Sequence, residues 1–500
     1  MANEQRVRSA ASDVTVLAAL AIMVVVIHFY CGNGYGFHRD ELQFLSDARH
    51  LDWGFVAYPP LTAFCGRVAI ALFGISPQVF RLPAALVNAA SLLVVGLIAR
   101  TLGGRRMALV VALCAVMPLA IAFSSVLQYN TFDLFAWCLL VLFTARVLAT
   151  GDERNWIGVG VAVGLGALSK YSMGIVVVSL GVGLIALPSQ RRHLRSRWFW
   201  YGALVMLVIA APNLVWLARH HFITLQMEHH IHVRDVRLGR ASGYYSDQVK
   251  FTLLGFPLAV AGLVSLLRNA RWRLLSFVYL GPFVLFALAK GRGYYLMPAY
   301  PVLYAAGAVA LERLAQRWGR GWRVTASTVA VVALLLNVAP IWWAYLPVWK
   351  VGSAGWNWQM KNNSDMQDEV GWPELVQQVA AVRDTLSPED RSKLAVLANN
   401  YGEAGAVELY GPQYGLPQPI SSTNSFHDRG YGPYDPETVI VLGDDLEDQL
   451  KNFEQCSVAA KVRIPYGVRN EESVYHPDIL VCRHLRRPWA EVWAKSQEFG

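Results

Sequence analysis

The feature that most constrains this chain is a series of apolar runs separated by short polar loops. A helix needs about 20 apolar residues to cross a bilayer, and most of the runs approach that length. Because 55% of the residues are hydrophobic and only 16% are charged, most of the chain is expected to lie in lipid. We therefore predict a polytopic α-helical membrane protein with about eleven transmembrane helices. The runs cover residues 14–30, 79–99, 107–123, 131–149, 156–169, 172–187, 198–217, 251–267, 274–289, 296–311 and 324–343. Residues 62–75 are too short to span and are expected to form an interfacial segment, and residues 220–248 are expected to form a polar outer loop.

Arginine clusters between these runs indicate the orientation. The clusters lie within residues 100–106, 191–197, 268–273 and 313–323, and alternating spans place all four on one side. Short cytoplasmic loops carry an excess of Lys and Arg, so this side, with the N-terminal tail that holds Arg6 and Arg8, is predicted to be cytoplasmic. The formal charge of +9 is then explained by the basic cytoplasmic loops and does not indicate nucleic-acid binding. The first run lacks a small-residue cleavage site and is expected to be a retained helix.

The composition changes near Leu346, where polar residues increase and no later run is long enough to span. We predict two domains, a membrane domain over residues 1–345 and an outer soluble domain over residues 346–500. Residues 393–400, 438–445 and 478–485 are typical of buried strands, and residues 372–380 and 446–456 of helices, which predicts a small α/β domain. Cys456 and Cys482 can form a disulfide if this domain faces an oxidising compartment.

A charged stretch, Gly36 to Leu61, follows the first apolar run directly. Charged groups beside a bilayer are costly unless they sit in water or pair, so this stretch is a candidate functional site. Adjacent carboxylates diverge on a helix and oppose each other on a strand, so Asp40 and Glu41 are not expected to share one substrate atom. One could act on an acceptor while the other orients a basic partner such as Arg39 or His38. The alternative is a loop whose charges contact only lipid headgroups or each other.

RDELQFLSDARHLDWGFVAYPPLTAF (residues 39–64) resembles the first external loop of bacterial GT-C glycosyltransferases of the protein O-mannosyltransferase and aminoarabinose-transferase type. Residues 124–137, 168–174, 212–235 and 290–303, and the C-terminal segments 399–411 and 415–436, extend this resemblance over nearly the whole chain. In that group an acidic residue at the Asp-Glu position is essential. The resemblance thus implies that residues 31–78 form the catalytic loop, with Asp40 as general base and Glu41 as its support. Tyr58 stands where the aminoarabinose transferases have a Lys before the two prolines.

The resemblance also implies the remaining site residues. The donor phosphate would be held by Lys170, Lys290, Arg292 and Arg234. The other substrate contacts would come from Arg39, Tyr58, Asp133, Tyr171 and Tyr294. Four of these positions have a simpler interpretation: Lys170 could extend to lipid headgroups, Lys290 and Arg292 could anchor the interface, and Asp133 could sit favourably at a helix N-terminus. The glycines near residue 402 could cradle an anion, although acceptor positioning or packing is the preferred interpretation.

We therefore predict an inner-membrane hexosyl- or pentosyltransferase. It would move a sugar from a polyprenyl-phosphate donor to lipid A, another glycan or a protein on the outer face. No cofactor, nucleotide or nucleic acid is expected, and no metal, because no two histidines of the 220–232 segment are four residues apart. The rival function is a polyprenyl-lipid transporter or flippase. Transporters tend to show repeated halves, which this sequence lacks. A non-catalytic scaffold would leave the charged loop without a purpose.

Overall fold

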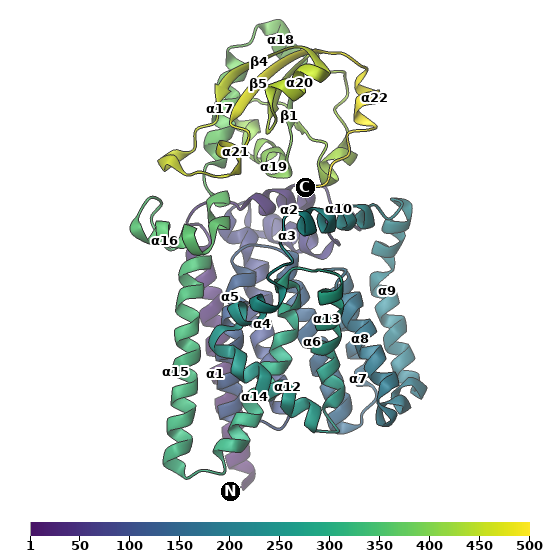
Figure 1. Cartoon of the computed structure of the whole chain (residues 1–500), viewed down its shortest axis with the longest axis vertical. Coiled ribbons are helices and arrows are strands. Elements are labelled where there is room, and N and C mark those ends of the chain that lie inside the picture. Colours follow the sequence, from purple (N-terminus) through teal and green to yellow (C-terminus); the bar gives the residue numbers. More distant parts are fainter. Residues whose placement is uncertain (1) are drawn as a thin grey trace.

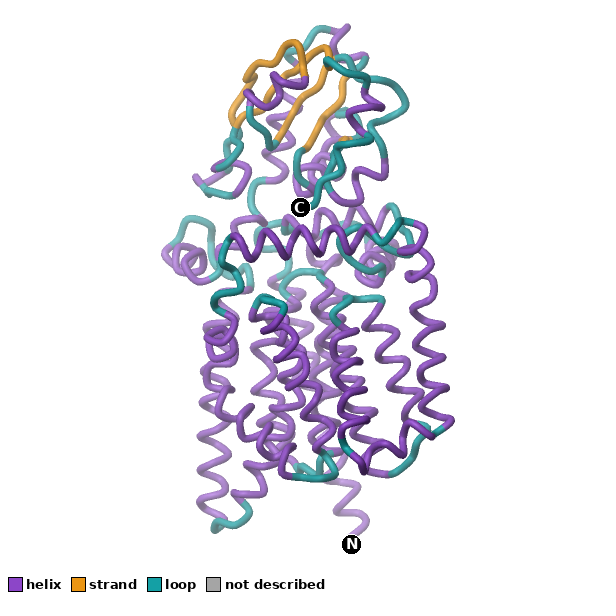
Figure 2. Tube along the Cα trace, turned by 45° about the vertical axis from the view of Figure 1, so that its right-hand side comes forward, coloured by secondary structure: helices purple, strands orange, loops and turns teal. Residues whose placement is uncertain are grey.

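The computed structural model describes residues 2–500, with the backbone alone for residues 2–14, 16–17, 320 and 323. The side chains of Arg6 and Arg8, which support the predicted orientation, therefore lie outside the described residues. Figure 1 shows three layers: a bundle of long helices at the N-terminal end, a band of short helices across the middle, and a domain with a sheet at the other end. In Figure 2 the strands are confined to that last layer.

The bundle is built from helices that overlap every predicted apolar run. Among the described residues, seven stretches are long and apolar enough to span a membrane. An eighth is added if residues 173–186 and the 3-10 helix η1 (Pro188–Arg195), bent by 112°, form one span. Residues 18–31, 155–167 and 273–288 are shorter apolar helices, so the number of eleven spans remains a prediction. The helices are α1 (Ala2–Cys31), α4 (Pro77–Thr101), α5 (Arg106–Ser124), α6 (Tyr129–Thr150), α7 (Asn155–Ala167), α8 (Met173–Ala186), α9 (Arg197–Arg219), α12 (Phe256–Arg268), α13 (Phe277–Leu288), α14 (Tyr300–Ala315) and α15 (Arg320–Tyr345).

The middle band contains the predicted catalytic loop. Its first helix, α2 (Arg39–Arg49), starts with a capping box, in which the His38 ring accepts from the Asp40 N–H and the Glu41 carboxylate accepts from the His38 N–H. Helix α3 (Leu61–Phe73) has 13 residues and lies in this band, as predicted for an interfacial segment. The segment expected to be a polar loop at 220–248 instead forms α10 (Ile223–Arg237) and α11 (Tyr244–Thr252). Helix α16 (Ala354–Asn362) and the 3-10 helices η2 (Leu253–Gly255), η3 (Arg273–Ser276), η4 (Gly293–Ala299) and η5 (Ser364–Glu369) complete the connections.

The C-terminal layer is the predicted small α/β domain. Its five-stranded sheet has the order β2-β1-β3-β5-β4, parallel across β2 (Pro419–Ile420), β1 (Leu394–Ala398) and β3 (Thr438–Leu442), and antiparallel where β5 (Asp478–Leu485) and β4 (Phe453–Lys461) join. The three predicted strands are confirmed. The predicted helix at 446–456 is partly wrong, because α20 (Leu446–Asn452) stops at residue 452 and the next residues pair with β5. That pairing places Cys456 opposite Cys482, and the two form a disulfide.

The helices of this domain cover the sheet and meet the middle band. They are α17 (Trp372–Asp384), α18 (Pro388–Ser392), α19 (Tyr401–Tyr410), α21 (Glu471–Val474) and α22 (Trp489–Trp493), with the 3-10 turns η6 (Gly411–Tyr414), η7 (Asn424–Arg429) and η8 (Pro465–Gly467). One apolar core runs from Leu42 and Leu45 of α2 to Trp372 of α17 and Val407 of α19. Arg429 also donates to Asp47 of α2 at 2.7 Å. Helix α2 is therefore held between the bundle and the C-terminal domain.

Candidate active site

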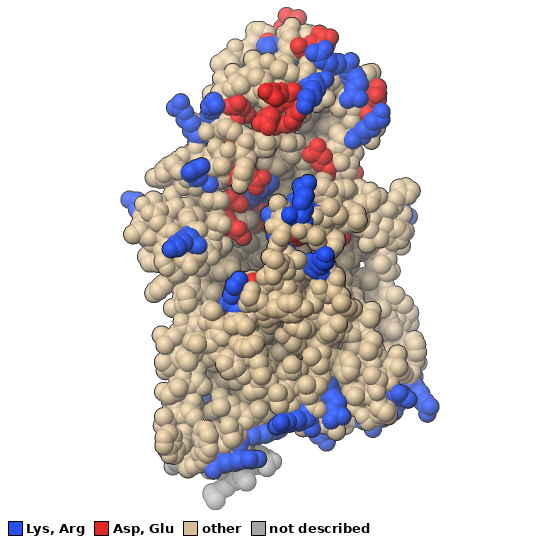
Figure 3. Space-filling model, viewed as in Figure 1, with Lys and Arg blue, Asp and Glu red and all other residues tan. Residues whose placement is uncertain are grey.

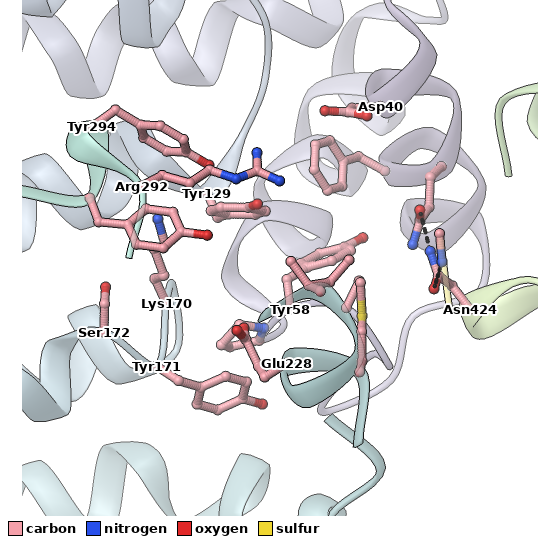
Figure 4. Close-up of a pocket in the computed structure, with 18 of the residues that line it drawn as sticks. Asp40, Tyr58, Tyr129, Lys170, Tyr171, Ser172, Glu228, Arg292, Tyr294 and Asn424 are labelled. Carbon is pink, nitrogen blue, oxygen red and sulfur yellow. Dashed lines mark hydrogen bonds between the residues drawn. The ribbon is translucent and has the colours of Figure 1, made fainter. Parts of the chain in front are cut away.

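A cavity of about 730 Å³ lies where the middle band meets the C-terminal domain. Figure 4 shows its lining side chains converging from different elements, and Figure 3 shows acidic and basic groups around a hollow at this level. Five cations and three carboxylates line it, so its formal lining charge is positive. The charged residues are Arg39, Lys170, Arg234, Arg240 and Arg292, with Asp40, Glu228 and Glu471.

Asp40 is the second residue of α2 and lines the cavity. Its backbone N–H donates to His38 Nδ1 at 3.1 Å, so the capping box fixes the backbone position from which the Asp40 side chain extends. Its Oδ1 accepts a hydrogen bond from the Tyr401 hydroxyl at 2.9 Å. Tyr401 belongs to α19, which means that the C-terminal domain reaches the predicted base directly.

Glu41 lies elsewhere. Its side chain is fully buried outside the cavity lining, and its Oε2 is 2.6 Å from Arg81 Nη2 at the start of α4. The Leu127 N–H donates to Glu41 Oε1 at 2.8 Å. The two adjacent carboxylates diverge, as expected on a helix, but the basic partner is Arg81 and not the neighbouring Arg39.

Lys170 lines the cavity from the turn between α7 and α8. Its Nζ donates to Asn130 Oδ1 at 2.8 Å and lies 4.9–5.6 Å from the ring centres of three tyrosines, so aromatic faces surround the ammonium group. The three are Tyr129, Tyr294 and Tyr295. Burial lowers the pKa of Lys170, while the carboxylates of Asp133 and Glu228 act in the opposite direction.

Two arginines add positive charge beside Lys170. Arg292 forms a two-point pair with Asp235 of α10, with Nε to Oδ2 at 2.5 Å and Nη2 to Oδ1 at 2.6 Å. This pair ties α10 to the turn before η4. Arg234, one residue before Asp235, lines the cavity, and its buried Nε has no hydrogen-bond partner among the described residues.

The other predicted residues divide into two groups. Arg39, Tyr58, Tyr171 and Tyr294 line the cavity. Arg39 pairs with Glu471, Tyr58 donates to Asp47 at 2.7 Å, and Tyr171 donates to Asn213 at 3.3 Å. Asp133 is buried outside the lining and accepts from Trp137 at 3.0 Å, and Lys290 is exposed outside it.

The structure also brings in residues that the sequence did not indicate as site residues. Glu228 of α10 faces Lys170, and burial raises its pKa. Tyr401 and Asn424 come from the C-terminal domain. Glu228 lies among the histidines of a segment that the sequence predicts as a polar loop without a metal site, and Tyr401 lies 361 residues from the carboxylate it contacts. Among the residues that the structure describes, no three His, Cys, Asp or Glu side chains converge as a metal site.

Comparisons with known proteins agree with this architecture. A sequence model of the family described as dolichyl-phosphate-mannose-protein mannosyltransferase matches residues 57–216. The chain is 25% identical to the lipid A galacturonosyltransferase RgtD of Rhizobium johnstonii over 64% of this chain and 68% of that protein. It is 28% identical to the lipopolysaccharide core galacturonosyltransferase RgtA of the same organism, over 43% of each chain.

The fold is similar to that of ArnT from Cupriavidus metallidurans. The apo structure of ArnT superimposes with a TM-score of 0.60 and 16% identity, covering 95% of this chain and 98% of ArnT. The structure of ArnT bound to undecaprenyl phosphate gives a TM-score of 0.58. The predicted resemblance to the PMT-like group of GT-C proteins is confirmed. The alignment covers 95% of this chain, so the likeness in fold extends beyond the membrane bundle into the C-terminal sheet domain.

Proposed function

We propose that this chain transfers a sugar from a polyprenyl-phosphate donor to an envelope glycolipid or glycan, with Asp40 as the general base. The comparisons support a glycosyltransferase role. The observation that carries the proposal is the single cavity in which the Asp40 carboxylate faces the same space as Lys170, Arg234 and Arg292. A sugar phosphate needs these two kinds of group, a base for the attacking hydroxyl and cations for the departing phosphate.

In the proposed reaction the Asp40 carboxylate takes the proton of an acceptor hydroxyl as its oxygen attacks C1 of the sugar. The bond between C1 and the phosphate oxygen breaks, and its electron pair leaves with the polyprenyl phosphate. Lys170, Arg234 and Arg292 stabilise the charge that develops on this leaving group. Attack opposite the phosphate inverts the configuration at C1. Arg39, Tyr58, Tyr171 and Tyr294 shape the substrate space, and Glu41 supports Asp40 indirectly by fixing the start of α2.

For the donor, we propose a polyprenyl-phosphate-linked uronic acid. RgtD and RgtA are named as galacturonosyltransferases, and ArnT binds undecaprenyl phosphate. Among the five cations of the lining, Arg39 pairs with Glu471, and Arg240 and Arg292 pair with Asp235. Among the described residues Lys170 and Arg234 form no such pair, and these two cations suit a donor with two anionic groups, a phosphate and a sugar carboxylate. We propose lipid A or the lipopolysaccharide core as the acceptor, because RgtD and RgtA are named for these two acceptors.

We further propose the inner membrane of a bacterium, with the N-terminus in the cytoplasm and residues 346–500 as an outer domain. In the view of Figure 3, basic residues without acidic ones gather at the bundle end that lies farthest from the sheet domain. This pattern supports the cytoplasmic assignment of that end. The disulfide between Cys456 and Cys482 supports an oxidising environment for the sheet domain.

The test is transfer by the purified full-length protein in detergent. Polyprenyl phosphates that carry galacturonic acid or its neutral counterpart galactose are each offered with lipid A, and mass spectrometry detects the product. We expect transfer of the uronic acid and little of galactose. Equal transfer would remove the uronic acid assignment, and transfer of neither sugar to lipid A would remove the proposed donor and acceptor together.

A further inference from the structure

We propose that Tyr401 is a positioning residue for Asp40, so that the C-terminal domain completes the active site of the membrane bundle. This inference rests on the proposed function, because it assigns Tyr401 a task in the reaction that Asp40 performs. It adds a residue from a domain whose sequence indicated only acceptor positioning or packing.

The local sequence sets Tyr401 at the start of α19. Asn400 caps this helix, because its Oδ1 accepts from the Glu403 N–H at 2.9 Å. The cap makes Tyr401 the first helical residue, at the end of α19 that faces α2. From there its hydroxyl donates to Asp40 Oδ1 at 2.9 Å.

Two glycines allow α19 to approach α2 this closely. A Cβ added at Gly402 would come within 2.6 Å of Arg39 Cγ, and one added at Gly405 would come within 2.7 Å of the Leu42 carbonyl oxygen. Both distances are shorter than packed atoms allow, so larger residues would push the helices apart. The glycines near residue 402 therefore serve helix packing, and the packing sets the distance between Tyr401 and Asp40.

A second contact holds the tyrosine ring. The Arg39 guanidinium lies 4.9 Å from the centre of the Tyr401 ring, and Arg39 is itself paired with Glu471 of α21. Burial and the charge of Asp40 raise the pKa of Tyr401, while Arg39 opposes them. The phenol therefore keeps its proton at neutral pH and can act as a donor.

The bond leaves one oxygen of Asp40 available. Among the described residues no hydrogen bond reaches Oδ2, whereas Oδ1 is held by Tyr401. A carboxylate fixed through one oxygen presents the other in one orientation, which favours proton transfer from a substrate hydroxyl. The titratable and charged groups that act on Asp40 come from four elements or their caps: His38 and Arg39 of α2, Tyr129 of α6, Tyr294 of η4 and Tyr401 of α19.

The experiment compares Tyr401→Phe with Tyr410→Phe and Asp40→Asn in the full-length protein. Tyr410 is the last residue of the same helix, is also partly buried and lies outside the cavity lining, so it controls for the loss of a hydroxyl from α19. We expect Tyr401→Phe to lower kcat about tenfold with little change in KM, because a hydrogen bond to a charged group is lost. The acid limb of its pH–rate profile should move to higher pH, because the lost donor favoured the ionised carboxylate.

The midpoint of that limb does not depend on how much folded enzyme is present, so it remains informative if Tyr401→Phe is less stable. A Tyr401→Phe enzyme with the kcat and acid limb of Tyr410→Phe, beside an inactive Asp40→Asn, would overturn this inference and leave the proposed function intact. Transfer by Asp40→Asn at the wild-type rate would overturn the proposed function itself.

Discussion

Arg81 and Glu41 form an ion pair that is sealed from water between the start of α2 and the bundle. The side chains are 2% and 0% exposed, and Arg81 Nη2 lies 2.6 Å from Glu41 Oε2. Arg81 also donates to the carbonyl oxygens of Gly32 and Gly36, each at 2.9 Å. The pair therefore fastens both the start of α2 and the chain that leads into it, and Asp40 is left free to face the cavity.

Removing one charge of this pair should mainly cost stability. In Glu41→Gln the buried guanidinium of Arg81 loses its closer carboxylate partner but keeps Glu369, whose Oε1 lies 3.2 Å from Arg81 Nη2. The cost should therefore stay below that of a buried charge left without any partner, which is about 3–5 kcal/mol. Unfolding in detergent should occur at a clearly lower temperature, while Glu491→Gln, at an exposed position of α22, should match wild type. A Glu41→Gln protein of wild-type stability that transfers no sugar would instead place Glu41 in the reaction.

Lys170 should determine donor affinity. Lys170→Ala removes a cation that faces the cavity from within a cage of tyrosines, so KM for the polyprenyl-phosphate donor should rise at least about tenfold. KM for the acceptor should change much less. Lys250→Ala is the matched control, because Lys250 is exposed on α11, lies outside the cavity lining and pairs with Asp247. An unchanged donor KM in Lys170→Ala would remove Lys170 from the phosphate site.

The raised pKa of Glu403 leads to a prediction of how the stability of the folded protein depends on pH. Burial raises its pKa from 4.5 to about 8, with a further rise from Glu472 and an opposing effect of Arg39. Between these two values the folded protein keeps a proton that the unfolded chain releases, so the free energy of unfolding should fall as the pH rises. A single group of this kind contributes up to about 1.4 kcal/mol per pH unit.

Thermal unfolding at pH 5.5, 6.5 and 7.5 would measure this slope. Glu403→Gln should reduce the slope without abolishing it, because the pKa values of Asp368, Glu369 and Glu472 are raised in the same direction by burial. An equal slope in wild type and Glu403→Gln would show that Glu403 is not protonated in the folded protein.

The sequence alone predicted the features that depend on local pattern. Apolar runs indicated the bundle helices, because a spanning helix must be apolar over its whole length. The charge of the stretch around Asp40 in an apolar chain made Asp40 a candidate site residue, and the family resemblance added Lys170; both line the cavity. The strands of the C-terminal domain followed from short buried runs bounded by polar residues.

Contacts between distant segments could not be predicted in this way. Nothing near Glu41 indicates that its partner is Arg81, 40 residues later, or that Tyr401 reaches Asp40 across 361 residues. The predicted helix at 446–456 failed for a similar reason: residues 453–456 pair with β5, and this tertiary pairing overrides the local helical pattern. The segment at 220–248 was expected to be a loop because it is polar, yet α10 is a surface helix that covers the cavity with Met227, Glu228 and Ile231.

The central claim is that Asp40 is the base of a sugar transfer on the outer face. The most direct measurement is mass spectrometry of the envelope glycolipids and glycoproteins from three strains: a gene deletion, the deletion complemented with wild type, and the deletion complemented with Asp40→Asn. We predict that one sugar disappears from one acceptor in the deletion and returns only with wild type. Restoration by Asp40→Asn would contradict the account, and a polyprenyl-linked sugar stranded on the inner face of the deletion strain would favour a flippase.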